Sequence, residues 1–159
     1  MAKKSSEETA DDEARTTSVG LFNRAEAYWL SARALQEANI KHGHSHSPVR
    51  HLYYFAIELY LKAFLRQHGH SVAELSDSKT FGHHAHKIGV RAAELGLPLD
   101  RHDKELLDIM GNTDVVIRSR YIRTGAARYP TFETLNATCE NLREDVSKAL
   151  NRNGLAVRL

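Results

Sequence analysis

One segment, residues 49–68, constrains the fold of this chain more than any other. It reads VRHLYYFAIELYLKAFLRQH, and at about 100° per residue its apolar side chains cover most of a helix circumference. Ser47 and Pro48 precede it in the order preferred for an N-cap and a first helical position, and Gly69 ends it. A helix with so much apolar surface is buried, so we expect this one at the centre of a bundle.

The rest of the chain is also helical in pattern. Apolar residues recur at spacings of three and four in segments that begin at Val19, near Gly82, at Asp100 and at Phe132. Asp100 has the pattern of a helix N-cap, and residues 71–74 have the pattern of a capping-box turn. No segment shows sustained strand alternation. The sequence therefore predicts an all-α, up-and-down bundle of four to five helices over residues 19–154. Residues 1–18 contain no large apolar residue apart from Met1, so we expect a disordered or loosely ordered tail.

Composition limits the classes of protein. The 159 residues suit one domain, and 22 Lys and Arg against 20 Asp and Glu give a bias too weak to indicate nucleic-acid binding by itself. The single cysteine, Cys139, excludes an internal disulfide framework, and its place on an apolar stripe predicts a core residue. No apolar run approaches the roughly 20 residues of a membrane span, and the first residues have no apolar leader pattern. We expect a cytoplasmic protein with no cofactor and no membrane association.

Ten histidines are an enrichment that raises the question of a metal site. His42, His44 and His46 alternate in a short loop that either binds a transition metal or is a solvated polar loop. His83 and His86 are spaced to share a helix face but have no carboxylate or cysteine partner at ligand spacing. We favour the solvated loop and expect no metal.

Glu58, Lys62 and Arg66 form a narrow charged stripe on the apolar segment, at spacings of four. A glutamate four residues before a lysine is a favourable helical ion pair, worth roughly 0.3–0.5 kcal/mol when exposed. The alternative is that these charges, set among apolar neighbours, face a cleft or another charged helix.

The most basic segment is residues 114–129, with four arginines against one aspartate and two interleaved tyrosines. Arginine makes fork-shaped contacts to phosphate and tyrosine can stack on a base. The alternative is that cations near a helix C-terminus complement its dipole. The candidates for phosphate and base contact are Arg118, Arg120, Tyr121 and Arg123.

Taken together, three segments resemble the HEPN superfamily of small helical bundles. They are residues 53–70 (YYFAIELYLKAFLRQHGH), 81–97 (FGHHAHKIGVRAAELGL) and 118–125 (RSRYIRTG). Members often carry a segment like HAIELALKAFL, then GHDL with a downstream Gly-Leu, then an Arg-Tyr. The resemblance implies a four- or five-helix bundle, usually a homodimer.

The resemblance also implies function. Many members are metal-independent ribonucleases, often toxins in toxin–antitoxin or defence systems, whose site combines an arginine with a histidine, with four to six residues between the two. Others lack that motif and bind nucleotides or RNA, or partner a nucleotidyltransferase. In this chain no arginine is followed by a histidine at that spacing, and the aspartate of GHDL is replaced by His84.

Three hypotheses follow. The first is a non-catalytic HEPN-like protein that binds RNA or a nucleotide, with an antitoxin or nucleotidyltransferase as an expected partner. The second is a divergent metal-independent ribonuclease toxin, in which His83 acts with Arg118 or Arg120 as the catalytic candidates. The third is a helical dimerisation or partner-docking module. For the first hypothesis the expected ligand-binding residues are Arg118, Arg120, Tyr121, Arg123, Glu58 and Lys62, with His83 in the same cleft.

Overall fold

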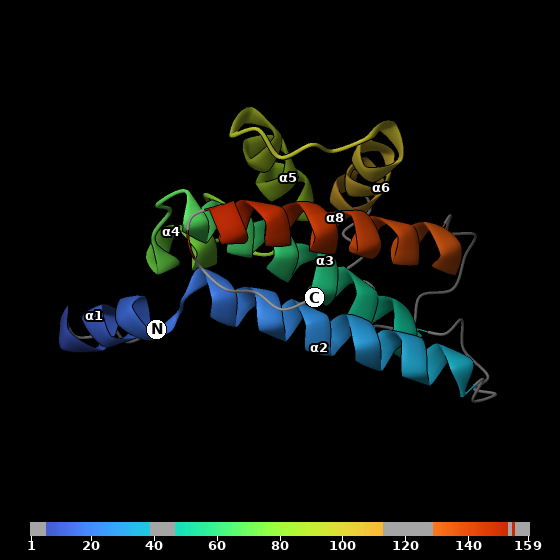
Figure 1. The fold of residues 1–159 in the computed structure, drawn as a ribbon, viewed down its shortest axis with the longest axis horizontal. Coiled ribbons are helices and arrows are strands. Elements are labelled where there is room, and N and C mark those ends of the chain that lie inside the picture. The colour runs from blue at the N-terminus through green and yellow to red at the C-terminus, as the bar shows by residue number, and fades with distance from the viewer. Residues whose placement is uncertain (1–5, 39–46, 113–128, 153, 155–159) are drawn as a thin grey trace.

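The computed structural model describes residues 6–38, 47–112, 129–152 and 154, and these ranges contain seven helices and no strand. The fold is all-α, as the sequence predicts (Figure 1). In chain order the helices are α1 (Ser6–Arg15), α2 (Ser18–Glu37), α3 (Ser47–Gln67), α4 (Val72–Ser76), α5 (Ala85–Glu94), α6 (Arg101–Asn112) and α8 (Phe132–Arg152). Helices α2, α3, α5, α6 and α8 correspond to the five expected helical segments, α1 lies in the expected tail, and the single-turn α4 lies at the predicted capping-box turn.

Helix α3 is the centre of the bundle. It packs against α2, α8, α5 and α4, and in Figure 1 it lies between α2 on one side and the pair α5 and α6 on the other. Its buried aromatic side chains include Tyr53, Tyr54 and Tyr60. The nearly all-round apolar character of residues 49–68 therefore has its cause in packing on several sides.

Helices α2 and α8 close the bundle against α3. Phe22, Trp29 and Leu135 are among the buried side chains that they contribute. Cys139 is fully buried on α8, which confirms its prediction as a core residue. Burial raises the pKa of its thiol well above the ordinary value, so the sulfur is an unreactive packing group.

Helices α5 and α6 pack closely, and a glycine permits the approach. A Cβ added to Gly89 would meet Leu107 Cδ1 at 2.5 Å. At the start of α6, the Asp100 carboxylate accepts the Asp103 N–H at 2.8 Å, which confirms the expected N-cap. In return the Asp103 carboxylate accepts the Asp100 N–H at 3.2 Å.

Two helix boundaries illustrate how local chemistry sets the chain path. Ser71 and Glu74 form the predicted capping box at α4. The helix expected to begin near Gly82 begins instead at Ala85, because residues 77–84 form a turn. Within this turn the Phe81 N–H donates to Asp77 O and the His84 N–H donates to Phe81 O, both at 2.9 Å.

The segment expected to be a tail contains α1, which extends beyond the end of α2 in Figure 1. Glu13 joins it to the rest of the molecule, because its carboxylate contacts the Arg66 guanidinium and accepts the Val72 N–H at 2.8 Å. None of the helices in the described ranges has the length and apolar character needed to cross a membrane.

Candidate functional site

Gly82 places His83 on the central helix. The backbone of Gly82 has a φ of +48°, and a Cβ there would meet the Ser78 Cα at 2.8 Å. A side chain at this position would be strained on both counts. The turn is reinforced by the Asp77 carboxylate, which accepts the Thr80 hydroxyl at 2.7 Å. The Gly-His pair noted in the sequence is thus the device that brings His83 against α3.

The centre of the site is the carboxylate of Glu58, a residue that is only 2% exposed. Lys62 Nζ donates to Glu58 Oε1 at 2.7 Å, and the Lys62 side chain is 11% exposed. His83 Nδ1 lies 3.1 Å from Oε1 and 3.3 Å from Oε2. A buried ion pair costs desolvation on both sides, so it is a weak source of stability.

His83 differs from its two partners in exposure, since 60% of its side chain is accessible. An ionised carboxylate only accepts hydrogen bonds, so Nδ1 carries the proton in the contact with Glu58. The other ring nitrogen, Nε2, is then a lone pair in the neutral ring and an N–H donor in the protonated ring. Glu58 therefore fixes the ring while its opposite edge can exchange a proton with a ligand or donate a hydrogen bond to one.

Aromatic rings border the site, and sequence reasoning missed them as functional candidates. The Phe55 ring stacks on Tyr28 of α2 with centroids 5.4 Å apart and planes inclined by 19°. The rings of His51 and His83 make T-shaped contacts with the same ring, with centroids at 4.5 and 6.5 Å. Phe55, Tyr28 and His51 are half-buried.

A sequence signal for this surface exists. His51, Phe55, Glu58 and Lys62 are spaced i, i+4, i+7 and i+11, which places all four on one face of α3. His51 and Phe55 continue this face toward the start of α3 and lie outside the stripe of acidic and basic residues that the sequence shows.

Arg66, the third member of the charged stripe, has a structural role. Its Nε donates to Thr16 O at 2.9 Å and its Nη2 donates to Glu13 O at 2.8 Å. Its Nη1 contacts the Glu13 carboxylate and donates to His70 O at 3.1 Å. The stripe therefore divides, with Glu58 and Lys62 in the site and Arg66 attaching α1.

The expectation that His83 and His86 share a helix face is wrong. His83 lies in the turn before α5, whereas His86 is on α5 and its Nδ1 is 2.9 Å from Asp108 Oδ1 on α6. Unlike Glu58, Asp108 is exposed, with 59% of its side chain accessible. Glu74 and Glu105, which contact His70 and His102, are exposed as well, so the buried carboxylate distinguishes the His83 contact from these three.

Several sequence candidates lie outside the described residues: Arg118, Arg120, Tyr121, Arg123, His42, His44 and His46. Gly111, which precedes the basic segment, and Tyr129, its last residue, are described. A Cβ at Gly111 would meet His86 Cβ at 2.6 Å, and the Tyr129 ring centroid is 5.2 Å from the Arg50 guanidinium. The chain therefore adjoins α5 at Gly111 and the start of α3 at Tyr129.

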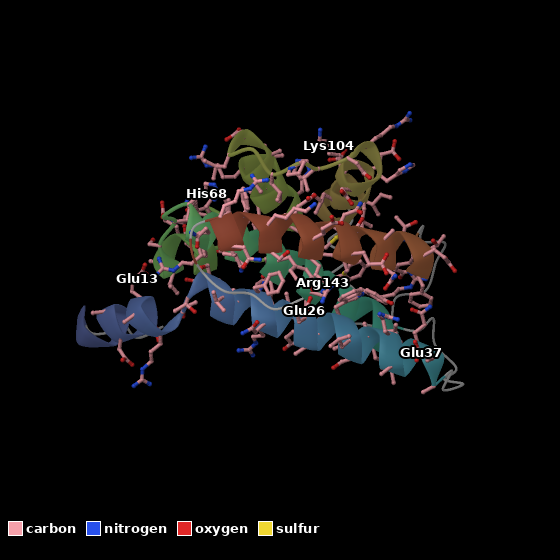
Figure 2. All side chains as sticks on the ribbon, viewed as in Figure 1. Glu13, Glu26, Glu37, His68, Lys104 and Arg143 are labelled. Carbon is pink, nitrogen blue, oxygen red and sulfur yellow. The ribbon has the colours of Figure 1, made fainter. Side chains whose placement is uncertain are left out.

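A second polar cluster lies between α2 and α8, where Glu26 and Arg143 point toward each other (Figure 2). Arg143 Nε donates to Glu26 Oε1 at 2.9 Å, and the Tyr60 hydroxyl also contacts this oxygen. Burial and then the hydrogen bond to Glu26 raise the pKa of Tyr60 above its ordinary value. The polar groups of this cluster bind one another, so the cluster has a structural role in holding α2, α3 and α8 together.

Within the part of the chain that the structure describes, no group of three or more His, Cys, Asp or Glu residues is arranged to hold a metal ion. Comparisons with protein-family models, curated proteins and solved structures give no match to this chain.

Proposed function

We propose that this protein is a HEPN-like bundle that binds RNA or a nucleotide at Glu58, Lys62 and His83 without efficient catalysis. The observation that supports the proposal is the contact between the exposed His83 ring and the buried Glu58 carboxylate. Because the ring is held at Nδ1, Nε2 is the nitrogen left for a ligand. When protonated, it donates a charge-assisted hydrogen bond to a phosphate oxygen.

The choice of RNA or a nucleotide as ligand rests on the resemblance to HEPN proteins and on the basic segment. We propose phosphate and base contacts for Arg118, Arg120, Tyr121 and Arg123, as their chemistry suggests. The resemblance further suggests a cytoplasmic homodimer with an antitoxin or a nucleotidyltransferase as partner. We include the dimer and the partner in the same proposal.

A second candidate function, metal-independent RNA cleavage, is favoured by the carboxylate behind His83. Neutral His83 would accept the proton of a ribose 2′-hydroxyl at Nε2. The 2′-oxygen then bonds to phosphorus while the bond from phosphorus to the 5′-oxygen breaks, and the leaving oxygen takes a proton from water. Arg118 or Arg120 would stabilise the charge on the phosphate.

One experiment separates these functions. Wild-type protein, His83→Ala and Arg120→Ala are incubated with labelled RNA in EDTA, and bound and cleaved RNA are read on native and denaturing gels. His86→Ala is the matched control, since His86 is a partly exposed histidine with a carboxylate partner of its own. Binding without cleavage, weakened in His83→Ala and in Arg120→Ala but retained in His86→Ala, supports the first proposal.

Other outcomes assign the function differently. Cleavage lost in His83→Ala and Arg120→Ala overturns the first proposal in favour of the ribonuclease. Equal binding by all four proteins would reject the proposed site. If the protein neither binds nor cleaves RNA or nucleotides, the partner-docking module is the hypothesis that remains. Repeating the titration at several salt concentrations checks for phosphate contacts, because counterion release makes such binding steeply salt-dependent.

A further inference from the structure

The aromatic side chains of Phe55 and Tyr28 beside His83 make none of the hydrogen bonds of the ion pair. Phe55 is half-buried although it belongs to the central helix, whose other aromatic side chains from Tyr53 to Phe64 are buried. Its neighbour Tyr28 comes from a different helix and is half-buried as well. Two nearly parallel rings therefore reach the surface together, next to the exposed imidazole.

The spacing of these groups matches the parts of one nucleotide. The Phe55 and His83 ring centroids are 6.5 Å apart, so a base against the aromatic rings and a phosphate at His83 Nε2 need only one sugar between them. Aromatic side chains bind bases through their π-faces, and this contact is open only to a base that is not paired and stacked in a duplex.

Charge also distinguishes the two halves of this surface. Glu58 and Lys62 are buried and their opposite charges compensate each other. His83, which contacts Glu58, is the exposed titratable group of this site. Phe55 and Tyr28 add apolar area without a formal charge. A ligand that combines an anion with a flat, weakly polar ring can contact both His83 and the aromatic pair of Phe55 and Tyr28. An anion without such a ring can contact only His83.

We infer that Phe55 and Tyr28 form a stacking platform for an unpaired RNA base whose phosphate is bound at His83. This inference rests on the proposed function and adds to it the class of RNA, which is single-stranded. It also assigns a specificity role to two residues that the charged motifs of the sequence do not include.

The test compares three probes by fluorescence anisotropy in EDTA. They are a short 2′-O-methyl oligouridine that cannot be cleaved through its own 2′-oxygen, the same sugar–phosphate chain without bases, and the oligonucleotide paired with its complement. The proteins are wild type, Phe55→Leu, Tyr28→Leu and His83→Ala. Phe132→Leu is the matched control, because Phe132 is a half-buried phenylalanine that packs against Tyr53 and Arg50 instead.

The inference predicts that wild type binds the single strand about tenfold tighter than the chain without bases, which is the scale of one stacked base. Phe55→Leu and Tyr28→Leu should remove this preference and leave the affinity for the chain without bases unchanged. His83→Ala should weaken both, and Phe132→Leu neither.

Equal affinity of wild type for the two single-stranded probes, preference for the duplex, or an effect of Phe55→Leu no larger than that of Phe132→Leu would overturn the stacking platform. Binding that still depends on His83 would in that case leave the proposed function standing. Absence of binding to all three probes rejects the proposed function and the platform with it. A urea titration of each variant checks that the leucine substitutions leave the fold intact.

Discussion

Glu58 and Asp103 are two deeply buried carboxylates, with exposures of 2% and 1%, but they are held by different kinds of partner. Asp103 accepts hydrogen bonds from the Thr138 hydroxyl at 2.8 Å and from the Asp100 N–H. These are uncharged donors fixed within the α6 and α8 framework. Glu58 instead holds two titratable groups, the buried Lys62 ammonium and the exposed His83 ring.

The difference shows how burial alone fails to identify a functional carboxylate. A buried carboxylate whose partners are uncharged and enclosed stabilises a helix start and a helix contact. A buried carboxylate whose partner is exposed and titratable orients that partner at the surface and interacts electrostatically with it. The comparison makes Asp103 a structural residue and Glu58 a positioning residue, and the following variants test it from the largest expected effect to the smallest.

Lys62→Met should lower the free energy of unfolding by about 3 kcal/mol, because it leaves the Glu58 carboxylate buried without its closest cation. The double variant Glu58→Leu with Lys62→Met should return to within about 1 kcal/mol of wild type, since apolar replacement of a buried pair is often neutral. Urea unfolding measures both. A double variant as unstable as the single one would show that the pair itself stabilises the fold.

Asp103→Ala should lower the free energy of unfolding by about 2 kcal/mol, because the α6 start loses a capping partner and the buried Thr138 hydroxyl loses its acceptor. RNA binding by the folded protein should not change. Glu105→Ala, at an exposed α6 residue, is the control and should change stability little. A loss of affinity in Asp103→Ala would break the distinction between the two carboxylates.

The pH dependence of stability should carry a contribution from Asp103. Burial raises the pKa of its carboxyl group above the ordinary value, opposed first by the hydrogen bond from Thr138. The folded protein therefore binds this proton more readily than the unfolded chain, and the contribution to stability is present in acid and is lost as the pH rises through the folded-state pKa.

Unfolding of wild type and Asp103→Asn across about pH 4 to 7 measures this contribution. Relative to the asparagine variant, wild type should become less stable as the pH rises over that range. A stability difference that is constant with pH would contradict the raised pKa.

His83→Ala should change the free energy of unfolding by no more than about 0.5 kcal/mol, because most of the side chain is exposed and Lys62 still accompanies Glu58. The same variant should lose RNA affinity. Large destabilisation would instead make His83 a structural partner of Glu58, like the donors around Asp103.

Local patterns in the sequence were sufficient for much of the fold. The Ser71 capping box, the Asp100 N-cap and the buried Cys139 each depend on residues within one helix or its first turn, and all three are confirmed. The all-round apolar character of residues 49–68 likewise placed α3 at the centre. These signals are local because helix geometry fixes which neighbours share a face.

Contacts between helices were harder to predict, because helical periodicity says nothing about how one helix is positioned along another. The stacking of Tyr28 on Phe55 depends on that position, and so does the attachment of Arg66 to Glu13. The charged stripe and the Gly-His pair did point to Glu58 and His83, and the structure brings them together. The role of the arginines at 118–123 stays a prediction.

The attachment of α1 has a consequence for length variation at this end of the protein. Arg66 contacts main-chain oxygens at Glu13 and Thr16 as well as the Glu13 carboxylate, so it recognises a fixed stretch of backbone. Residues added ahead of Glu13 leave that stretch unchanged. One residue inserted between Glu13 and Thr16 would rotate the carboxylate by about 100° around the helix and away from Arg66. Insertions and deletions should therefore be tolerated on one side of Glu13 only.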